Sequence, residues 1–592
     1  MSHELASLLL TTAIHNSLSS SLPLFVLLLD AKSAFDLVLR EILIRRLYLD
    51  TFPDQRIRFW DLRLSNRTTY CQWDNHLMGP IRDELGLEQG GPTSSDMYKE
   101  YNNEQLTTAQ ESGLGTTIVD KNVASNGQAD DAALMSNDFR QLQHLMDLTV
   151  AYCDKYQVQL SAGKTKLLLF SNSETDYVKY AKLLSPITIG DTPIQFVETA
   201  EHVGVLRSVS SNLPHIHQRI VSHKKALASI LSLGLSRRHR ANPLSSLRAE
   251  TIFGTPVLYS GVATLILQKA EVDILAHHVK ETIQNLLKLY SNTPEPVVFF
   301  LAGCLPGEAL LHLKQLTLFG MICRLPDNIL HKIAQELLIT ASQTNKNWFA
   351  QIRTLCFTYN LPHPLSLLSD PPKKEQYKRL LKNNITDFWQ SKLRAHCATL
   401  TSLKYFKPQF MSLSRPHPMW SSAVNSYQVN KCVVVARMIS GRFRCGSLLR
   451  HFTPSCTGIC ELCGLEIEDL DHILIPKCPH LQERRSLLIN FARDRLSKSQ
   501  PALAIFEKYL HNPDSDSFVQ FLLDPSAAPE IIAAAQVEPT ILSLIFRVTT
   551  TWCYSLNRSR LKLLGIWSYL VIHEKLVNLF KHYNRWFWLN KV

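Results

Sequence analysis

The first marked hydrophobic pattern in the 592-residue chain is an uninterrupted apolar run at residues 24–29. A run this short, bounded by Ser and Pro, predicts a strand buried on both faces. Residues 5–20 are rich in Ala, Leu and Ser with helical spacing, and they predict a helix packed under this strand. Asp30 follows the run directly, so we expect its carboxylate at the C-terminal end of the strand. The alternative is that Asp30 caps a following helix, since Asp is a favoured N-cap residue.

A second pattern surrounds residues 127–131, where two adjacent carboxylates lie in a small, turn-like setting. Residues 117–119 lead in and residues 132–135 lead out, which predicts a strand, a tight turn and a strand. Adjacent side chains on extended backbone point to opposite faces, but a turn lets Asp130 and Asp131 face one cleft. Two like charges this close repel each other unless a cation lies between them, and Mg²⁺ is the usual cation for such oxygen ligands.

A third carboxylate changes the chemistry that we expect. An Asp-Asp pair alone is common in exposed turns, but Asp30 would join this one from a neighbouring strand. Two acids from a turn and one from a strand end make a two-metal nucleotidyl-transfer site. We therefore predict Asp30, Asp130 and Asp131 as catalytic residues, and Asp30 and Asp130 as the ligands of two Mg²⁺ ions.

Helical periodicity dominates much of the remaining chain. Residues 96–110 and 139–160 predict helices, whereas residues 167–170 predict a strand. Residues 35–47 carry apolar side chains at the spacing of one amphipathic helix. From about 250 to 400 the pattern is mostly helical, with breaks at prolines.

Composition narrows the class of protein. At ~150 residues per domain the length predicts ~4 domains, and hydrophobic residues make up 45% of the chain, enough for real cores. A net charge of +12 and a pI near 9.0 favour polyanionic partners. The 13 cysteines are an odd number and mostly scattered, which argues against a secreted disulfide framework. The start lacks a signal peptide, and no uncharged apolar run is long enough for a bilayer, so we expect a soluble intracellular protein without membrane contact.

Basic side chains gather in two stretches. Between residues 215 and 240 they alternate with apolar residues in a helical pattern, and others flank Phe443. Such a face suits a nucleic-acid backbone, although a solvated helix would show a similar pattern. The residues that we predict to bind nucleic acid are Arg219, Lys224, Lys225, Arg237, Arg238, Arg442 and Arg444.

A cluster of cysteines and histidines lies in the C-terminal fifth of the chain. Its ligand types and its spacing, Cys-x2-Cys-x8-His-x5-Cys, are those of a small structural Zn²⁺ site. The alternative is a set of unrelated buried cysteines, and Cys456 and His480 are spares that could replace one ligand. The predicted ligands are Cys460, Cys463, His472 and Cys478.

Five short motifs, in order along the chain, resemble those of reverse transcriptases of retrotransposons without long terminal repeats, the LINE type. They are Asp-Ala-Lys-Ser-Ala-Phe-Asp at 30–36, Gln-Gly-Gly-Pro-Thr-Ser-Ser at 89–95, Ala-Asp-Asp at 129–131, Lys-Thr-Lys at 164–166 and His-Val-Gly-Val at 202–205. The last is similar to the primer-grip hairpin of that family. The family often also ends in a Cys-Cys-His-Cys module.

The resemblance implies roles around the nucleotide. Phe35 would contact the sugar and exclude a ribose 2′-hydroxyl, unless it is simply a core residue. Gln89 and Gly90 would face the nucleotide, with an ordinary loop as the alternative; the residues after them depart from the family's usual Pro-Leu-Ser-Pro. Lys164 would protonate the pyrophosphate leaving group or neutralise its charge, unless it is a surface lysine.

The resemblance also implies an α+β fold, with a right-hand polymerase palm built on an antiparallel sheet, a helical thumb and a mostly α-helical C-terminal region holding a small zinc module. We assign the palm to 1–208, the thumb to 209–310, a helical connector to 311–430, the basic segment with the zinc module to 431–480 and a helical tail to 481–592. Only 29 residues precede Asp30. We therefore expect an N-terminally truncated element, with the family's fingers largely missing and no endonuclease.

The resulting hypothesis is the RNA-directed DNA polymerase of a retrotransposon, acting on an RNA template, a DNA primer and deoxynucleoside triphosphates. Its cofactors would be two Mg²⁺ ions and one structural Zn²⁺ ion, and its site of action the nucleus if it is active in retrotransposition. One alternative is a catalytically inactive relic, or a host-recruited RNA- or DNA-binding protein, which the missing fingers favour. Another is a group II intron maturase-like protein, although its maturase and HNH regions are not apparent. The oligomeric state stays open.

Overall fold

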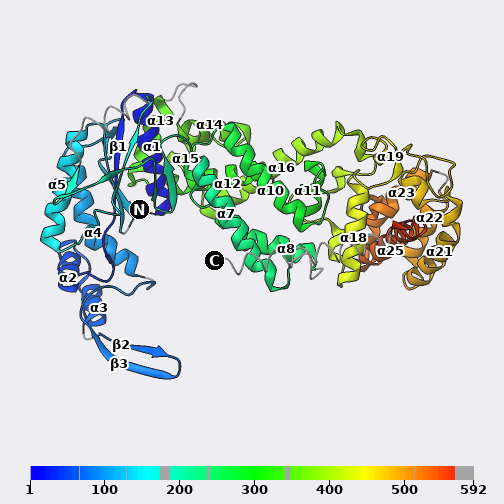
Figure 1. The fold of residues 1–592 in the computed structure, drawn as a ribbon, viewed down its shortest axis with the longest axis horizontal. Coiled ribbons are helices and arrows are strands. Elements are labelled where there is room, and N and C mark those ends of the chain that lie inside the picture. The colour runs from blue at the N-terminus through cyan, green and yellow to red at the C-terminus, as the bar shows by residue number, and fades with distance from the viewer. Residues whose placement is uncertain are drawn as a thin grey trace. The chain divides into compact units, whose positions relative to one another are not determined.

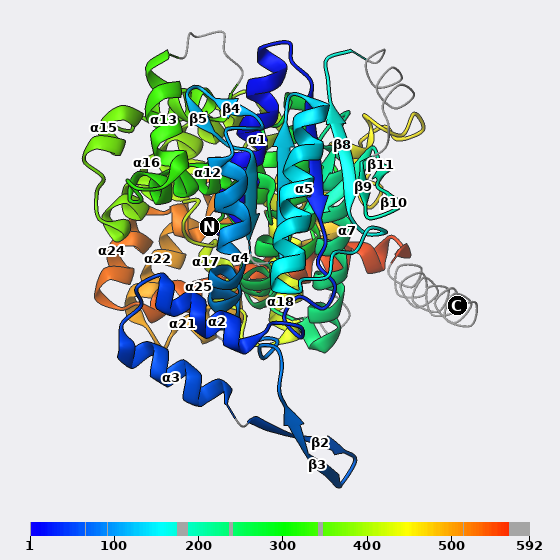
Figure 2. The ribbon, with the colours of Figure 1, turned by 90° about the vertical axis from the view of Figure 1, so that its left-hand side faces the viewer.

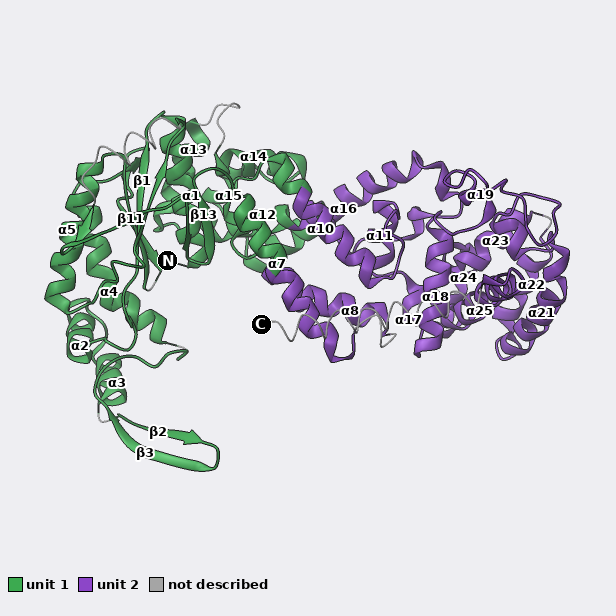
Figure 3. Cartoon of the chain, in the orientation of Figure 1, with its two compact units in different colours: residues 1–221, 258–273, 311–384 green, residues 222–257, 274–310, 385–592 purple. Residues whose placement is uncertain are grey.

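A computed structural model describes residues 2–566, except 66, 92, 129, 174–186, 236–240, 341–346 and 513. Arg237 and Arg238 of the predicted nucleic-acid face lie outside the described residues. The chain forms two compact units, each assembled from separate stretches of sequence (Figure 3). Unit 1 contains residues 1–221, 258–273 and 311–384, and unit 2 contains residues 222–257, 274–310 and 385–592. The five consecutive segments assigned from sequence stay a prediction.

A five-stranded sheet lies at the centre of unit 1 (Figure 1). Its order is β11-β8-β1-β7-β6, and all neighbours are antiparallel except β11 and β8, which are parallel. All six residues of the central strand are buried, which confirms the strand predicted from the apolar run. The strands are β1 (Leu24–Leu29), β6 (Ser125–Gln128), β7 (Asp131–Ser136), β8 (Lys166–Phe170) and β11 (Gln195–Phe196).

Helices cover both faces of this sheet (Figure 2). On one face, Phe25, Leu27 and Leu29 of β1 share a core with apolar side chains of α5 (Phe139–Tyr156) and α4 (Ser94–Glu111). The other face lies against α1 (His3–Ser19), where the side-chain amide of Asn126 in β6 donates to the Ala6 carbonyl at 2.6 Å. These three helices confirm the helical patterns read from the sequence.

The strand that leads into the Asp-Asp turn is not the predicted one. Residues 117–118 form β4 (Thr117–Ile118), which pairs with β5 (Lys121–Asn122) as a separate ribbon. The strand before the turn is β6, which is polar yet buried. Two of its polar side chains donate to distant carbonyls, as when Ser125 Oγ donates to Leu106 O at 2.7 Å, whereas Asn126 Oδ1 and Gln128 Oε1 are buried without a hydrogen-bond partner. Hydrophobic periodicity cannot reveal a strand stabilised in this way.

The segment after Asp30 is also not helical, so Asp30 is not a helix cap. Residues 32–37 form turns, and helix α2 (Arg40–Leu49) begins only after them. Backbone groups from elsewhere hold the turns in place: Lys32 N donates to Gln159 O at 2.7 Å, and Leu87 N donates to Phe35 O at 2.7 Å. After α2 come α3 (Asp54–Leu64) and a hairpin of β2 (Arg67–Trp73) and β3 (His76–Asp83).

A second hairpin, β12 (Thr199–His202) with β13 (Val205–Ser208), confirms the short hairpin predicted at residues 202–205. Its two-residue turn places Val203 and Gly204 at φ 46 and 75, a left-handed geometry that glycine adopts at little cost. A further two-stranded ribbon pairs β9 (Thr188–Ile189) with β10 (Thr192–Pro193), and the other described elements of unit 1 are helical. They lie within α7 (Leu213–Ile230), η4 (Val262–Thr264), α12 (Gly307–Cys323), α13 (Ile329–Thr340), α14 (Trp348–Thr358), α15 (Pro364–Ser369) and α16 (Lys374–Ala398), some of which continue into unit 2.

Unit 2 is helical apart from short turns. Helix α25 (Thr540–Leu563) packs against α18 (Ser426–Ile439), α21 (Gln482–Leu496) and α23 (Ser515–Leu523). The buried Trp552 of α25 contacts aromatic rings from two neighbouring helices, with centroid separations of 6.2 Å to Phe506 and 5.7 Å to Phe518. The described part of the C-terminal region is therefore a packed helical core. Its other helices are α8 (Pro243–Ala249), α10 (Lys269–Leu286), α11 (Glu295–Ala302), α17 (Pro418–Ser421), α19 (Gly446–Leu449), α20 (Leu470–Leu474), α22 (Gln500–Leu510) and α24 (Pro529–Val537).

Among the described residues, no single helix is long and apolar enough to cross a membrane. One bent pair, α11 followed by α12, satisfies the length and composition requirement only when the two helices are taken together.

Candidate functional site

The register of the sheet brings Asp30 beside Asp131. Strands β1 and β7 pair Leu28 with Ala133 and Leu29 with Ala132, so the next position along β1 lies opposite Asp131. Cross-strand partners share a face of a sheet, and Asp130 occupies the turn immediately before Asp131. The three predicted acids therefore meet at one edge of the sheet.

Asp30 is anchored through its backbone, while its carboxylate stays available. Its N–H donates to Thr165 Oγ1 at 3.3 Å, and its carbonyl accepts from Ser161 N at 2.8 Å. The carboxylate oxygen Oδ2 is buried without a hydrogen-bond partner, and Lys164 Nζ lies 3.7 Å from it. Lys164 therefore lies close to Asp30, although the Lys164 side chain is largely exposed.

Asp131 is the most perturbed of the three acids. Its pKa is raised to about 6, mainly by burial and also by the charges of Asp130, Glu201 and Asp30, whereas the hydrogen bond from Val203 N acts in the opposite direction. The Val203 N–H donates to Asp131 Oδ2 at 2.5 Å, so the turn of the β12–β13 hairpin touches the acidic site directly.

His202, in the same hairpin, lies 3.9 Å from Asp131 between Nε2 and Oδ1. This imidazole is completely buried, and burial, with the nearby charge of Arg207, lowers its pKa to about 3. His202 is therefore neutral at physiological pH and does not form an ion pair with Asp131. Its two ring nitrogens have no hydrogen-bond partner.

Asp130 is exposed on its turn, and a buried tyrosine connects it with Phe35. Burial raises the pKa of the Tyr98 hydroxyl, and the charge of Asp130 raises it further, which places the two groups near each other. The ring of Phe35 packs on Tyr98 with a centroid separation of 5.0 Å. Phe35 is half-buried in a turn, not in the predicted helix. It thus packs against the hydrophobic core that contains Tyr98.

The Gln-Gly motif lies beside the turn after Asp30. Gln89 is exposed, and its amide donates to Asp36 Oδ1 at 3.2 Å. Gly90 follows at φ +80 with open space around its Cα, a backbone conformation that favours glycine. The motif leads directly into α4, so the predicted loop-to-helix transition is confirmed.

The three carboxylates have the chemistry to hold divalent cations. Their charges oppose one another, and one buried oxygen lacks a partner, so a hard cation would relieve both costs. They are nevertheless more widely spaced than a closed metal cage. Within the described ranges, the single set of such side chains with all ligand atoms within 4.8 Å of one another lies elsewhere, in unit 2.

Residues 7–199 match the family described as reverse transcriptase (RNA-dependent DNA polymerase). Residues 7–199 are a reverse transcriptase domain. This segment contains the acids, the Gln-Gly motif and Lys164, and the function that it supports is that of an RNA-directed DNA polymerase, a transferase. A search of curated proteins finds no significant match to the chain.

Basic residues beyond the reverse transcriptase domain differ in availability. On α7, Lys224 and Lys225 are exposed, whereas Arg219 is half-buried with its Nε unpartnered. In unit 2, Arg444 is exposed and its guanidinium lies 5.3 Å from the Tyr290 ring centroid. Arg442 is half-buried. The exposed three remain the better candidates for phosphate contacts, because a phosphate can reach them without rearrangement.

The set of metal-type ligands in unit 2 consists of the predicted four. Cys460, His472 and Cys478 are buried and Cys463 is half-buried, with Cys463 Sγ 3.4 Å from His472 Nε2. Neither spare ligand, Cys456 or His480, belongs to this set. The sequence spacing thus identified one compact cluster in the folded protein.

Local hydrogen bonds shape the cluster for a cation. The turn after Cys460 closes through Gly464 N to Cys460 O at 2.8 Å, and His472 lies in α20, capped by Asp469. The His472 Nδ1 atom lies 3.5 Å from a Glu466 carboxylate but makes no hydrogen bond. Burial raises the pKa of Cys463, but backbone N–H groups and neighbouring thiols outweigh it, and the net pKa is lowered. Burial, in contrast, raises the pKa of Cys460 to about 11, so the two thiols of the Cys-x2-Cys pair shift in opposite directions.

Two residues near these sites, Tyr98 and Arg485, carried no signal in the sequence. The charge of Asp130 raises the pKa of the Tyr98 hydroxyl, but Tyr98 belongs to none of the five motifs. Val203 and Thr165 lie within the motifs at 202–205 and 164–166, but their hydrogen bonds to Asp131 and Asp30 could not be read from those motifs. Arg485 donates to the carbonyls of Cys478 and His472, at 2.8 and 3.1 Å, and so braces the cysteine-histidine cluster. A single arginine in an amphipathic helix gives no hint of such a role.

Proposed function

We propose that this chain is the reverse transcriptase of a retrotransposon without long terminal repeats, adding deoxynucleotides to a primer 3′-hydroxyl on an RNA template. The observation that supports the chemistry is the convergence of Asp30, Asp130 and Asp131 at one sheet edge, with Lys164 beside Asp30. The LINE-type assignment rests on the motifs in the sequence. The expected compartment is the nucleus.

In this proposal Asp30 and Asp130 hold two Mg²⁺ ions. When bound, these ions supply the Lewis acidity that lowers the pKa of the 3′-hydroxyl and neutralises the leaving phosphates. Asp131 keeps its carboxylate aimed at the site because the Val203 N–H holds one of its oxygens. Since Val203 is the turn of the β12–β13 hairpin, the position of the acid and that of the hairpin depend on each other.

The remaining residues act on the nucleotide. Lys164 is exposed and makes only a long contact of 3.7 Å with Asp30, so its ammonium is free to reach the leaving pyrophosphate and donate a proton or charge. The Phe35 ring, supported by Tyr98, offers a flat apolar surface for the sugar. Gln89 is held by Asp36, in the turn that follows Asp30.

The proposal includes one structural Zn²⁺ ion at Cys460, Cys463, His472 and Cys478. Four protein ligands complete a tetrahedron and leave no open position, so the role of this ion is to stabilise the fold. The neighbouring Arg444 would bind nucleic acid beside the zinc module.

The decisive test replaces one acid by its amide. We expect Asp130→Asn to reduce primer extension on an RNA template by about 10³-fold or more, because metal charge stabilisation is worth several kcal/mol. Asp147→Asn, an exposed acid on α5, is the control and should retain parental activity. Parental extension by the Asp130→Asn protein would overturn the assignment of the catalytic acids.

A further inference from the structure

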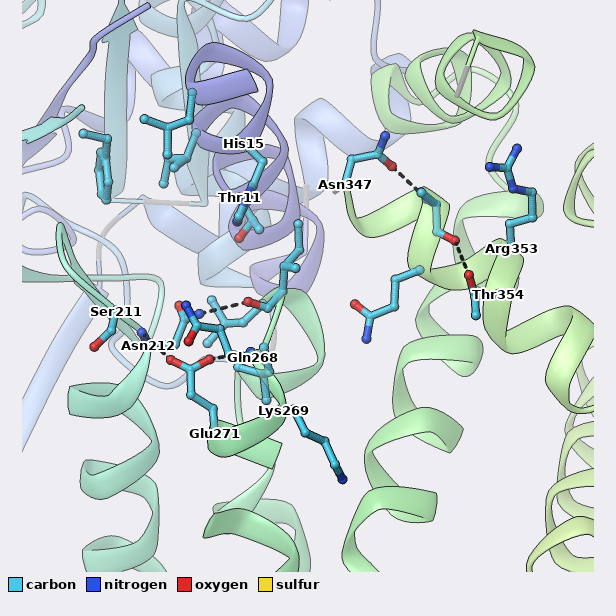
Figure 4. A pocket seen from close by; sticks show the side chains of 18 of the residues that line it. Thr11, His15, Ser211, Asn212, Gln268, Lys269, Glu271, Asn347, Arg353 and Thr354 are labelled. Carbon is cyan, nitrogen blue, oxygen red and sulfur yellow. Dashed lines mark hydrogen bonds between the residues drawn. The ribbon is translucent and has the colours of Figure 1, made fainter. Parts of the chain in front are cut away.

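Unit 1 contains a cavity of about 1370 Å³ that takes no part in the proposed polymerase site. Its walls are the C-terminal half of α1, the link from β13 to α7, residues 265–271 and helix α14 (Figure 4). Ligand pockets commonly measure ~300–1,000 Å³, so this space can hold a small organic molecule together with water.

Much of the wall is apolar, and it comes from segments far apart in the sequence. Such a surface gains free energy when an apolar body displaces water from it. The apolar lining includes Ile14, Leu18, Phe170, Leu265, Leu361 and Pro364.

Arg207 of β13 supplies a buried positive charge to the wall. Its guanidinium donates to Thr11 Oγ1 at 2.8 Å and to the carbonyl and hydroxyl of Ser7 at 2.7 Å. These partners are neutral, and no carboxylate in the described part of the chain forms an ion pair with Arg207. A buried charge without a counter-charge is costly, so an anion nearby would stabilise it.

The carboxylate that lines the cavity is already engaged. Glu271 accepts from Asn212 N at 2.9 Å and from Gln268 N at 2.8 Å, and it thereby caps the start of α10 (Figure 4). The Glu271 carboxylate therefore accepts hydrogen bonds from backbone N–H groups and is not the partner of Arg207.

Two polar atoms on the lining residues lack partners. Arg207 Nε and Gln351 Oε1 are both buried with no hydrogen bond. Buried polar groups are almost always hydrogen-bonded, and such exceptions call for an explanation. A ligand that brings a negative charge and a hydrogen-bond donor would account for both.

We propose that this cavity binds a small organic anion with an apolar body, whose charge lies toward Arg207 and whose donor group is accepted by Gln351. Arg207 belongs to the same hairpin as Val203, which holds Asp131. A ligand in the cavity would therefore stabilise the same hairpin that holds Asp131.

The test uses the full chain and the fluorescent sulfonate 1-anilinonaphthalene-8-sulfonate, an aromatic anion. Ala350→Trp places an indole in the cavity wall and should weaken binding of the probe by about tenfold or more. Thr358→Trp, on the same helix but outside the lining, should bind like the parent. Near-parental circular dichroism of Ala350→Trp would separate filling of the cavity from loss of fold.

Competition identifies the charge that the site requires. Octanoate should displace the probe at about tenfold lower concentration than octylammonium, because only the carboxylate complements Arg207. Equal displacement by both, or unchanged binding to Ala350→Trp, would overturn the proposal. Displacement by a short RNA at lower concentration than octanoate would also overturn it, since the cavity would then belong to the nucleic-acid path.

Discussion

At the scale of single residues, the contacts of Asp131 shift its pKa in opposite directions. Asp131 is about one-third exposed, and burial with nearby negative charge raises its pKa, while the Val203 N–H stabilises its anion. The site thus carries an electrostatic cost in the absence of a cation. Such a cost is expected where a protein is organised to bind a divalent ion.

Asp131→Asn keeps an oxygen for the Val203 N–H but removes a negative charge. Because folding raises the pKa of Asp131 to about 6, its ionisation above that pH costs stability. After a discount for solvent screening, we expect the variant to be about 1 kcal/mol more stable than the parent at pH 7 without Mg²⁺.

Mg²⁺ should reverse this order of stability. A ligand present at ten times its dissociation constant stabilises the native state by about 1.4 kcal/mol, which the parent should gain and Asp131→Asn should largely lose. Thermal unfolding with and without Mg²⁺ measures both effects, with Asp147→Asn as the reference. Equal stabilisation of parent and variant would remove Asp131 from the cation site.

His278 provides a test of pH dependence in unit 2. It faces His223, whose Nδ1 lies 2.9 Å from His278 Nε2, and His223 in turn contacts Glu250 at 3.0 Å. Burial, together with the charges of His223, Lys224 and His277, lowers the pKa of His278 to about 4. Between pH 6.5 and about 4 the unfolded chain therefore binds more protons at this position than the native protein does.

Stability should fall as pH decreases through that window, by up to about 3 kcal/mol from this group. His278→Gln removes the titration, so its unfolding free energy should fall less steeply than that of the parent. The exposed His217→Gln is the control. Urea unfolding at pH 7 and pH 4.5 gives the two slopes, and identical slopes would show that His278 titrates normally.

At the scale of elements, polar contacts determine which segments are buried where the hydrophobic pattern gives no prediction. Strand β6 is polar and buried because α1 and α4 supply carbonyls to its side chains. The cysteine-histidine cluster likewise depends on a neighbouring helix, since Arg485 of α21 is buried against its carbonyls. With Zn²⁺, three thiolates and one imidazole, the cluster would carry one net negative charge, which Arg485 offsets.

Replacing this arginine should weaken the cluster without touching a ligand. We expect Arg485→Met to lower Zn²⁺ affinity by about 10- to 100-fold, the usual effect of removing a residue that orients metal ligands. Arg484→Met is the matched control, because Arg484 is exposed on the same helix. Metal content after dialysis against a chelator distinguishes them, and Cys463→Ser gives the reference for loss of a ligand. No metal in the parent would refute the zinc site, whereas equal retention by both arginine variants would refute only the role of Arg485.

At the scale of the whole molecule, the net charge of +12 affects association with polyanions. The predicted contacts with nucleic acid are distributed over both compact units, with Arg219 in unit 1 and Lys224, Lys225, Arg442 and Arg444 in unit 2. Binding should therefore depend on many small phosphate contacts.

Five phosphate contacts predict that the logarithm of RNA affinity falls with the logarithm of salt concentration with a slope of about −3.5. Replacing Lys224 and Lys225 together by alanine should reduce the magnitude of this slope by about 1.4. Lys508→Ala is the control, because Lys508 is paired with Glu530. Filter binding across a salt series measures the slopes, and an unchanged slope in the double variant would exclude this part of α7 from the RNA path.

Much of the proposed site chemistry could be predicted from the sequence, because metal binding and phosphoryl transfer require particular residue types. The acids, the Gln-Gly motif and the four cysteine-histidine ligands were all predicted from residue type and spacing, and the last four form one cluster in the folded protein. Strand β1 and helix α5 were also predictable, since each buries a hydrophobic pattern with its own period. The prediction placed a strand correctly at residues 117–118, but that strand belongs to a separate ribbon and does not lead into the Asp-Asp turn. It also failed at the turns after Asp30, where backbone pairing with distant segments overrides local preference.

The sequence by itself determined which groups can perform the chemistry, because carboxylates, thiolates and imidazoles are set by residue identity and order. Only the tertiary structure decided which groups surround them. Val203 N–H reaches Asp131 across 72 positions, and Arg207 reaches Ser7 across 200. Such contacts satisfy buried polar atoms with partners that no local pattern encodes, so they exist only once the chain has packed.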